Sequence, residues 1–273
     1  LLIILSFSFL FSLNIITSNE EEVNNIASHL KILETGPIHS TVKDLQLFDS
    51  YDYNYQPQDF EIPIKLTSTT LRPLSRDMSL KESAHLLRRT IVGPTIEEIN
   101  SISTININDA VEYILRDIPR PEPPGEWINH PIPYYQDYTQ EQIDSLLNSW
   151  VSQQTELGYW WRNNMFYNST SITELMTLFW HDHFATSAET IFYPPAMYHQ
   201  NRVLRENSTG NFKDLVTMMT FDPAMMIWLN NNENSVGSIN ENFSRELLEL
   251  FTLGEGNYTE QDVTEAARAL TGY

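Results

Sequence analysis

Apolar residues recur at intervals of three and four through much of the chain, which is the spacing of one buried face of an α-helix. The clearest examples are Val111, Ile114 and Leu115; Ile172, Leu175, Met176 and Phe179; and Val263, Ala266, Ala267 and Leu270. No alternating segment bounded by hairpin turns, the signature of a strand, stands out. The pattern therefore predicts an all-α fold, a multi-helix domain of about eight helices between residues 79 and 273.

Helix starts are marked by a recurring pair, a Ser or Thr followed three residues later by Glu or Gln. In such a capping box the hydroxyl accepts a hydrogen bond from the backbone amide three residues later, and the side chain of that later residue accepts one from the backbone amide of the Ser or Thr. The pairs are Ser79 with Glu82, Thr95 with Glu98, Thr139 with Gln142, Ser171 with Glu174, and Ser238 with Glu241. Asp222 followed by Pro223 predicts another helix start. Gly254 and Gly272 stand where helices need a left-handed closing residue.

Residues 1–18 form a signal-peptide-like segment, because an apolar stretch is followed by polar residues and is shorter than the roughly 20 residues that span a bilayer. We therefore expect export to the periplasm, the outer envelope or the extracellular space, and no transmembrane span in the mature chain. An uncleaved membrane anchor is the alternative, because no basic residues precede the apolar stretch.

The rest of the chain divides by composition. Residues 19–78 show no sustained periodicity and carry a Glu20-Glu21-Glu22 run, which predicts an irregular acidic extension. Residues 118–133 are rich in Pro, which cannot continue a helix, so this segment is a predicted linker between two helical groups. Since the sequence stops directly after Gly272, we expect residues 79–273 to be the N-terminal portion of a longer helical domain, incomplete at its C-terminus.

Charge and cysteine content exclude several functions. The chain has 36 acidic and 16 basic residues, a net charge of −20, which repels the phosphates of nucleic acids. We therefore expect no nucleic-acid partner. With no Cys, the chain offers no thiol nucleophile, disulfide or thiolate zinc site.

Four segments together resemble one known family. They are HLLRRTIVGPT at 85–95, MTLFWHDHFATS at 176–187, NFKDLVTMMTFDPAMMIWL at 211–229, and NENFSRELLELFTLGEGNYTEQDVTEAARALTGY at 240–273. This chain resembles the bacterial family known as domain of unknown function 1800 over roughly residues 79–273. Ile91 and Tyr273 depart slightly from the family pattern. The resemblance implies an exported, largely helical protein longer than this chain, with no established activity to carry over.

His181 and His183 are the leading candidates for chemistry. Two imidazoles near carboxylates can hold a divalent metal that activates water for hydrolysis. On a continuous helix, however, residues two apart point about 200° from each other, so only one could then face the ion. An extended backbone would bring both to one side. The structural alternative, which the pattern favours, is that His183 is a buried histidine with its hydrogen bonds satisfied inside the core. His181 then forms a hydrogen bond with a neighbouring residue.

An acidic helix supplies the remaining candidate site residues. Glu246 and Glu249 are candidate metal ligands and Glu241 a candidate general base. On a helical wheel Glu241, Arg245 and Glu249 form one stripe, opposite Phe243, Leu247, Leu250 and Phe251. The structural alternative is again favoured, with Glu241 completing a capping box and Arg245 pairing with both glutamates on a solvated face.

Other features point mainly to structure. Arg88 and Arg89 complement the end of a helix, and His199 lies one turn from Arg202. Aromatic residues can stack on sugars, but at helical spacing they are more typical of a core. This applies to Trp160, Trp161, Trp180 and Trp228.

Two functional hypotheses follow. The first is a secreted, metal-dependent hydrolase-like enzyme that uses the His and Glu residues above. The second is a non-catalytic cell-envelope or extracellular protein that binds a protein or polymer partner, in which the same residues cap and pair helices.

Overall fold

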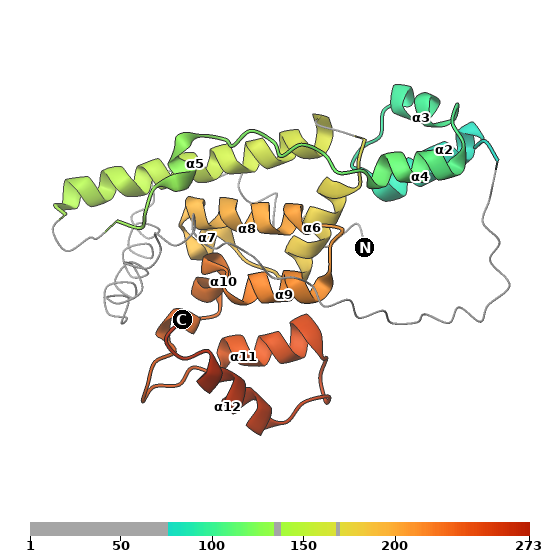
Figure 1. Cartoon of the computed structure of the whole chain (residues 1–273). Coiled ribbons are helices and arrows are strands. Elements are labelled where there is room, and N and C mark those ends of the chain that lie inside the picture. The colour runs from blue at the N-terminus through green and yellow to red at the C-terminus, as the bar shows by residue number, and fades with distance from the viewer. Residues whose placement is uncertain (1–75, 134–137, 168–169) are drawn as a thin grey trace. The chain divides into compact units, whose positions relative to one another are not determined.

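The computed structural model describes residues 76–133, 138–167 and 170–273. This part of the chain is helical and contains no strand, only two isolated bridges. The all-α prediction is therefore confirmed. The α-helices are α2 (Leu80–Thr90), α3 (Ile96–Ile102), α4 (Ile107–Leu115), α5 (Gln140–Tyr167), α6 (Thr173–His183), α7 (Ala188–Ile191), α8 (Pro194–Glu206), α9 (Phe212–Thr220), α10 (Pro223–Trp228), α11 (Asn242–Glu246) and α12 (Glu260–Ala269) (Figure 1).

Shorter helical turns complete the secondary structure. Two 3-10 turns cover Glu126–Asn129 and Asn231–Glu233, and a π-helix, Leu247–Thr252, follows α11 directly. The predicted signal-like segment and residues 19–75 of the predicted acidic extension lie outside the described residues. No helix in the described ranges is long and apolar enough to cross a membrane.

Most predicted helix starts are confirmed. Ser79 and Thr95 form capping boxes at α2 and α3, and Thr139 does so with Gln142 at α5. Asp222 caps α10 ahead of Pro223. Gly254 and Gly272 adopt positive φ angles of 82° and 88° as expected.

Two predicted capping boxes are wrong. Ser171 instead accepts from the amide of Thr173, and α6 begins at Thr173, because Glu174 turns inward to a charged partner. Ser238 lies in a turn paired with Ser235, and α11 begins only at Asn242. Conversely, Thr259 forms a capping box with Asp262, an acid that the Glu/Gln pattern does not include.

Helix α8 is the central element of the described helices. It packs against α5, α6, α7, α9, α10 and the 3-10 turn Glu126–Asn129. Two prolines open it, which suits the first turn, where amide donors have no helical acceptor. Because neighbouring elements surround α8, most of its side chains are buried. The buried side chains include polar ones such as Gln200, Asn201 and Arg205.

Three clusters of buried apolar side chains hold the helices together. The first joins α2, α3 and α4 around Leu87 and Ile114. The second joins α5, α7, α8 and α10, and includes Trp127 from the Pro-rich segment 118–133. The third joins α6, α8, α9, α10 and α11, and includes Phe184 and Phe243.

The predicted apolar faces are only partly correct. Val263 and Ala267 of α12 are fully buried as expected. On α6, however, Phe179 is 53% exposed while Glu174 and Thr177 are buried. The face of α6 toward α8 is polar because it carries a buried ion pair, so apolar spacing alone pointed to the wrong side.

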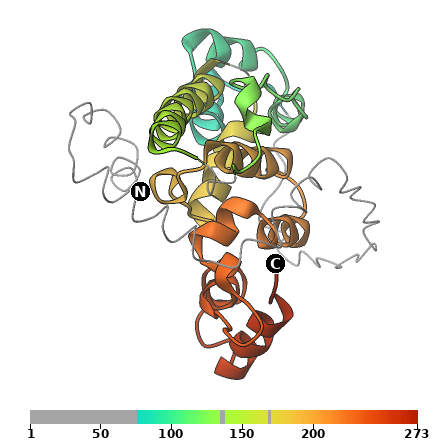
Figure 2. The same ribbon diagram turned by 90° about the vertical axis from the view of Figure 1, so that its left-hand side faces the viewer.

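The segment after α10 forms a hairpin of α11, the π-helix and α12, whose two α-helices lie side by side (Figure 1, Figure 2). In the π-helix the amide of Leu253 donates to the carbonyl of Leu248, five residues earlier. This wider turn changes which side chains face inward. Phe251 is buried, but Leu250, predicted on the same face, is 63% exposed.

Candidate functional site

The two candidate histidines lie on the last turn of a continuous helix. Helix α6 runs through His183, so His181 and His183 point in different directions. His181 faces the ring of Trp161 on α5, with ring centroids 5.1 Å apart. His183 faces the rings of Trp180 and Phe251 in the third cluster and the ring of the more exposed Phe212.

His183 links α6 to the π-helix. Its Nε2 lies 3.1 Å from the carbonyl oxygen of Phe251. Because a carbonyl only accepts, the imidazole donates from Nε2, and that nitrogen is committed to the backbone. His183 thus contacts the π-helix after α11 through a backbone oxygen and not through a carboxylate.

His181 is partly enclosed between α5 and α6. Burial lowers the pKa of His181 to about 4, against a weaker opposing effect of the neighbouring Asp182 carboxylate. The side chain is therefore a neutral imidazole packed edge-on against an indole ring near neutral pH.

This burial predicts a pH-dependent contribution to stability. Since the pKa of His181 is below its ordinary value of 6.5, its contribution is complete above pH 6.5 and is lost as the pH falls toward 4. The loss amounts to about 3 kcal/mol at most. His181→Gln should remove this component, so in urea denaturation the stability of the variant relative to wild type should increase as the pH falls over that range. His85→Gln, which removes an exposed imidazole, serves as the control. A difference in stability between His181→Gln and wild type that does not change with pH would contradict the prediction.

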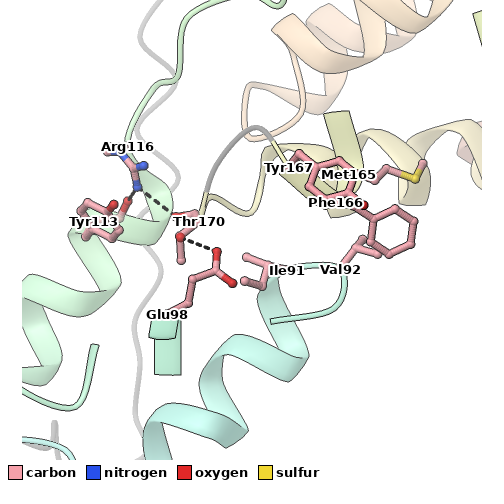
Figure 3. Close-up of a pocket in the computed structure, with 9 residues that line it drawn as sticks. All are labelled: Ile91, Val92, Glu98, Tyr113, Arg116, Met165, Phe166, Tyr167 and Thr170. Carbon is pink, nitrogen blue, oxygen red and sulfur yellow. Dashed lines mark hydrogen bonds between the residues drawn. The ribbon is translucent and has the colours of Figure 1, made fainter. Parts of the chain in front are cut away.

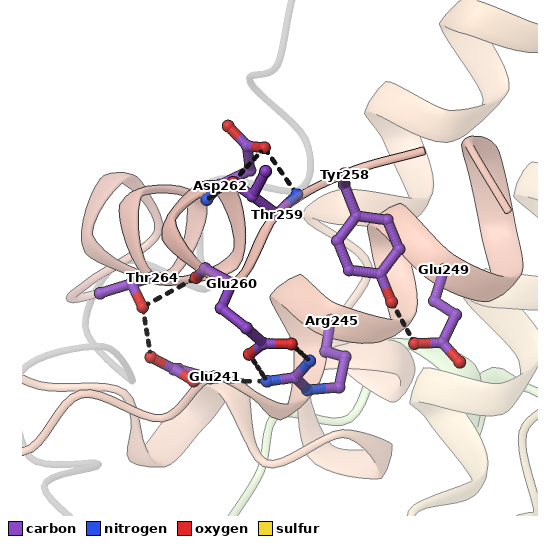
Figure 4. A network of polar contacts seen from close by, with 8 residues as sticks. All are labelled: Glu241, Arg245, Glu249, Tyr258, Thr259, Glu260, Asp262 and Thr264. Carbon is purple, nitrogen blue, oxygen red and sulfur yellow. Dashed lines mark hydrogen bonds and ion pairs between the residues drawn. The ribbon is translucent and has the colours of Figure 1, made fainter. Parts of the chain in front are cut away.

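Arg245 organises the acidic residues between α11 and α12 (Figure 4). Its guanidinium donates to both carboxylate oxygens of Glu260, at 2.9 and 2.7 Å, and lies 3.6 Å from Glu241. Glu241 also accepts from the hydroxyl of Thr264 at 2.7 Å. The hydrogen bonds from Arg245 lower the pKa of Glu260. This network joins the two helices of the hairpin.

The other two glutamates have separate surroundings. Glu249 accepts a hydrogen bond from the hydroxyl of Tyr258, which raises the pKa of that phenol (Figure 4). The predicted pairing of Arg245 with Glu241 is confirmed, while Glu249 pairs with Tyr258 instead. Glu246 is the last residue of α11 and is half-buried.

The candidate metal ligands do not converge. Within residues 76–133, 138–167 and 170–273, no three His, Asp or Glu side chains are grouped closely enough to hold a metal ion. His181 faces an indole, His183 a carbonyl, and Glu241 and Glu249 their hydroxyl-bearing neighbours. These side chains therefore contact neighbouring helices and segments and do not form a common metal site.

Sequence reasoning missed a buried ion pair, and it identified the buried Asp222 only as a helix cap. Glu174 and Arg205 form a two-bond ion pair between α6 and α8, at 2.8 and 3.0 Å, with both side chains buried. Asn201 accepts a third bond from the guanidinium at 2.6 Å, and the ring of Trp160 lies 4.9 Å beneath it. Because Glu174 matched a capping pattern, it was interpreted as a helix cap and not as half of an ion pair. No sequence pattern singled out Arg205.

Asp222 is the second buried group. Its Oδ1 accepts from the amide of Met225 at 2.9 Å and from Gln200 at 2.8 Å. Gln200 in turn accepts from the hydroxyl of Thr186 at 2.6 Å. Burial raises the pKa of Asp222 to about 7, although these hydrogen bonds partly oppose the rise.

A pocket with a volume of about 340 Å³, here named the α4–α5 pocket, lies where the ends of α4 and α5 meet α2 and α3 (Figure 3). Its lining residues are Ile91, Val92, Glu98, Tyr113, Arg116, Met165, Phe166, Tyr167 and Thr170. Several are aromatic side chains that remain well exposed to solvent. Sequence reasoning did not bring these residues together, because they come from segments that are far apart in the chain.

Hydrogen bonds fix the polar side of this pocket. Arg116 lies 3.7 Å from the centre of the Tyr113 ring, and its Nη1 donates to the backbone carbonyls of Tyr113 and Thr170. Glu98 accepts from the Thr170 hydroxyl at 2.7 Å and from the Thr95 amide at 2.8 Å. Partial burial alone would raise the pKa of Glu98, but these hydrogen bonds bring that pKa below its usual value.

The tryptophans considered for sugar stacking pack against other side chains or form hydrogen bonds within the fold. Trp161 is buried, and Trp160 and Trp228 pack against the second apolar cluster. The indole N–H groups of Trp160 and Trp180 donate to the carbonyls of Glu122 and Ser208. His199 contacts the carbonyl of Ile128 at 2.9 Å, consistent with the structural interpretation.

Comparison with known proteins gives one match. The model of the family described as "Protein of unknown function (DUF1800)" matches residues 85–273, which confirms the resemblance seen in the sequence. Neither the curated proteins nor the solved structures include a match. The matched region contains the α4–α5 pocket, the buried ion pair and the α11–α12 hairpin. The chain therefore belongs to the DUF1800 family of proteins of unknown function.

Proposed function

We propose that this chain is an exported, non-catalytic protein that binds a partner molecule in the α4–α5 pocket. Export is inferred from the signal-like residues 1–18. The observation that carries the proposal is the composition of the pocket. Its nine lining residues supply rings, apolar side chains and hydrogen-bonding groups, and none of them is His, Ser, Cys or Asp.

This composition supports binding over catalysis. A hydrolytic site pairs a nucleophile or a bound water with a base that can take up a proton. Among the described residues that line the pocket, Glu98 is the one carboxylate, and hydrogen bonds from Thr95 and Thr170 stabilise its ionised form. A carboxylate held in this way is a weak base, because its affinity for a proton is reduced.

The competing hypothesis is a metal-dependent hydrolase with His181, His183, Glu246 or Glu249 as ligands and Glu241 as base. Metal analysis of the full chain after mild purification separates the two. We expect less than one equivalent of zinc, iron or manganese, and the same content in His181→Ala and His183→Ala, because the two imidazoles point apart. One equivalent of metal that is lost in both variants would overturn the proposal and favour the hydrolase.

A further inference from the structure

We propose that the α4–α5 pocket binds an uncharged saccharide, taking up one end or one short segment of it. The inference rests on the proposed function and specifies the ligand of the same pocket. The volume of about 340 Å³ is at the lower end of the range of about 300–1,000 Å³ usual for small-molecule sites. That size suits a small part of a polymer better than a large cofactor.

Three aromatic residues with exposed side chains are among those that line the pocket. Phe166 and Tyr167 at the end of α5 are 55% and 82% exposed, and Tyr113 on α4 is 43% exposed. In Figure 3 the first two rings lie on one side of the pocket and Tyr113 on the other, with Glu98 and Thr170 between them. Rings that stay wet in the unbound protein can release water when the C–H face of a sugar covers them.

The backbone at Gly93 helps to place one of these rings. Gly93 has a φ of +64°, which disfavours other residues, and a Cβ at this position would lie 3.4 Å from the Phe166 ring. The ring therefore rests closely over bare backbone. A ring held in place before binding loses less conformational freedom when a ligand arrives.

The polar groups of the pocket match hydroxyls, which both donate and accept. Among the described residues, the phenol hydroxyls of Tyr113 and Tyr167 have no hydrogen-bond partner, so each can donate and accept. Arg116 uses Nη1 for two carbonyls and keeps Nη2 and Nε as donors. Glu98 Oε1 accepts one bond, from Thr170, and keeps a lone pair.

The charges of the pocket favour a neutral ligand. Glu98 is held ionised by its hydrogen bonds, and Arg116 carries the opposite charge on the other side of Thr170. An anionic ligand would face the ionised Glu98. A cationic ligand would face Arg116. A ligand with many hydroxyls and no charge meets neither repulsion.

The test uses a reporter inside the pocket. The full chain is labelled with ¹³C at its methionine methyl groups, and the Met165 signal is assigned by its loss in Met165→Ile. Neutral hexasaccharides of glucose, galactose and N-acetylglucosamine are then titrated, with hexamers of galacturonate and glucosamine as the anionic and cationic probes. We expect at least one neutral probe to shift the Met165 signal saturably, while Met225, which is fully buried elsewhere, does not shift.

Two tyrosines on α5 provide a matched pair of variants. Tyr167→Ala removes a pocket ring and should raise the Kd for the neutral probe about tenfold. Tyr159→Ala removes a ring of similar position, 58% exposed and outside the pocket, and should leave the Kd unchanged. The inference is overturned if no neutral probe shifts Met165, if a charged probe binds more tightly, or if both variants bind alike.

Failure of this inference is distinguishable from failure of the proposed function. If neutral saccharides do not bind and the chain also lacks a histidine-dependent metal, the ligand class is wrong while the binding function stands. If the chain holds one equivalent of a metal that both histidine variants lose, the proposed function itself is wrong, whatever the saccharides do.

Discussion

Replacing Arg205 by Met is expected to lower the free energy of unfolding by about 3–5 kcal/mol. The substitution leaves the Glu174 carboxylate buried between α6 and α8 without the guanidinium that now donates two hydrogen bonds to it. Met fills much of the same volume, so the lost charge partner dominates the effect. Urea denaturation followed by far-UV circular dichroism measures the change.

Two further variants show whether burial is the cause. Arg268 pairs with Glu265 on the exposed side of α12, so Arg268→Met should cost less than about 1 kcal/mol. The double variant Glu174→Leu with Arg205→Met should recover a large part of the stability lost in Arg205→Met, because no unpaired charge is left inside. A cost for Arg205→Met no greater than that for Arg268→Met would show that the pair does not hold α6 against α8.

Asp222→Asn is expected to change how stability depends on pH. The pKa of Asp222 in the folded protein is about 7, above its ordinary value of 3.8, so the folded state holds this proton more tightly than the unfolded chain does. The resulting stabilisation is complete below about pH 4 and is lost as the pH rises through 7. Its size is about 4 kcal/mol at most.

Asn keeps an oxygen acceptor for Met225 and Gln200 but carries no titrating proton. The stability of Asp222→Asn relative to wild type should therefore increase steadily between pH 4 and 7. Denaturation at several pH values measures this, with Asp109→Asn, an exposed acid in the first turn of α4, as the control. A constant difference between Asp222→Asn and wild type would contradict the raised pKa.

Asp222 and His181 act in opposite directions over nearly the same range of pH. Lowering the pH from 7 to 4 strengthens the contribution of Asp222 and weakens that of His181. In the wild-type protein the two contributions offset each other. Each single variant should therefore reveal the contribution of the other residue more clearly than wild type does.

Local patterns in the sequence predicted local structure well. The hydroxyl and carboxylate pairs at Ser79 and Thr95 depend only on neighbouring backbone, so the first turn of each helix follows from a few residues. Ser171 followed the same pattern, but Arg205, 31 residues after Glu174, drew that carboxylate away. Partners at that separation are invisible to a pattern that spans one turn.

The candidate site shows the same limit. A helical wheel predicted one stripe of Glu241, Arg245 and Glu249, and the first pair does form. The wheel assumes a uniform turn, and the π-helix that begins at Leu247 breaks it, so Glu249 contacts Tyr258 instead. The α4–α5 pocket could not be predicted at all, because Tyr113 and Tyr167 line one pocket only after four helices have packed.

The wide turn at Leu247–Thr252 also constrains how this sequence can vary in length. An α-helix advances by about 100° per residue, so deleting a single residue here would return the turn to ordinary geometry and swing everything after it around the helix axis. Glu260 would then leave Arg245, and Thr264 would leave Glu241. We therefore expect variants of this protein to tolerate substitutions in the π-helix better than the deletion of one residue from it.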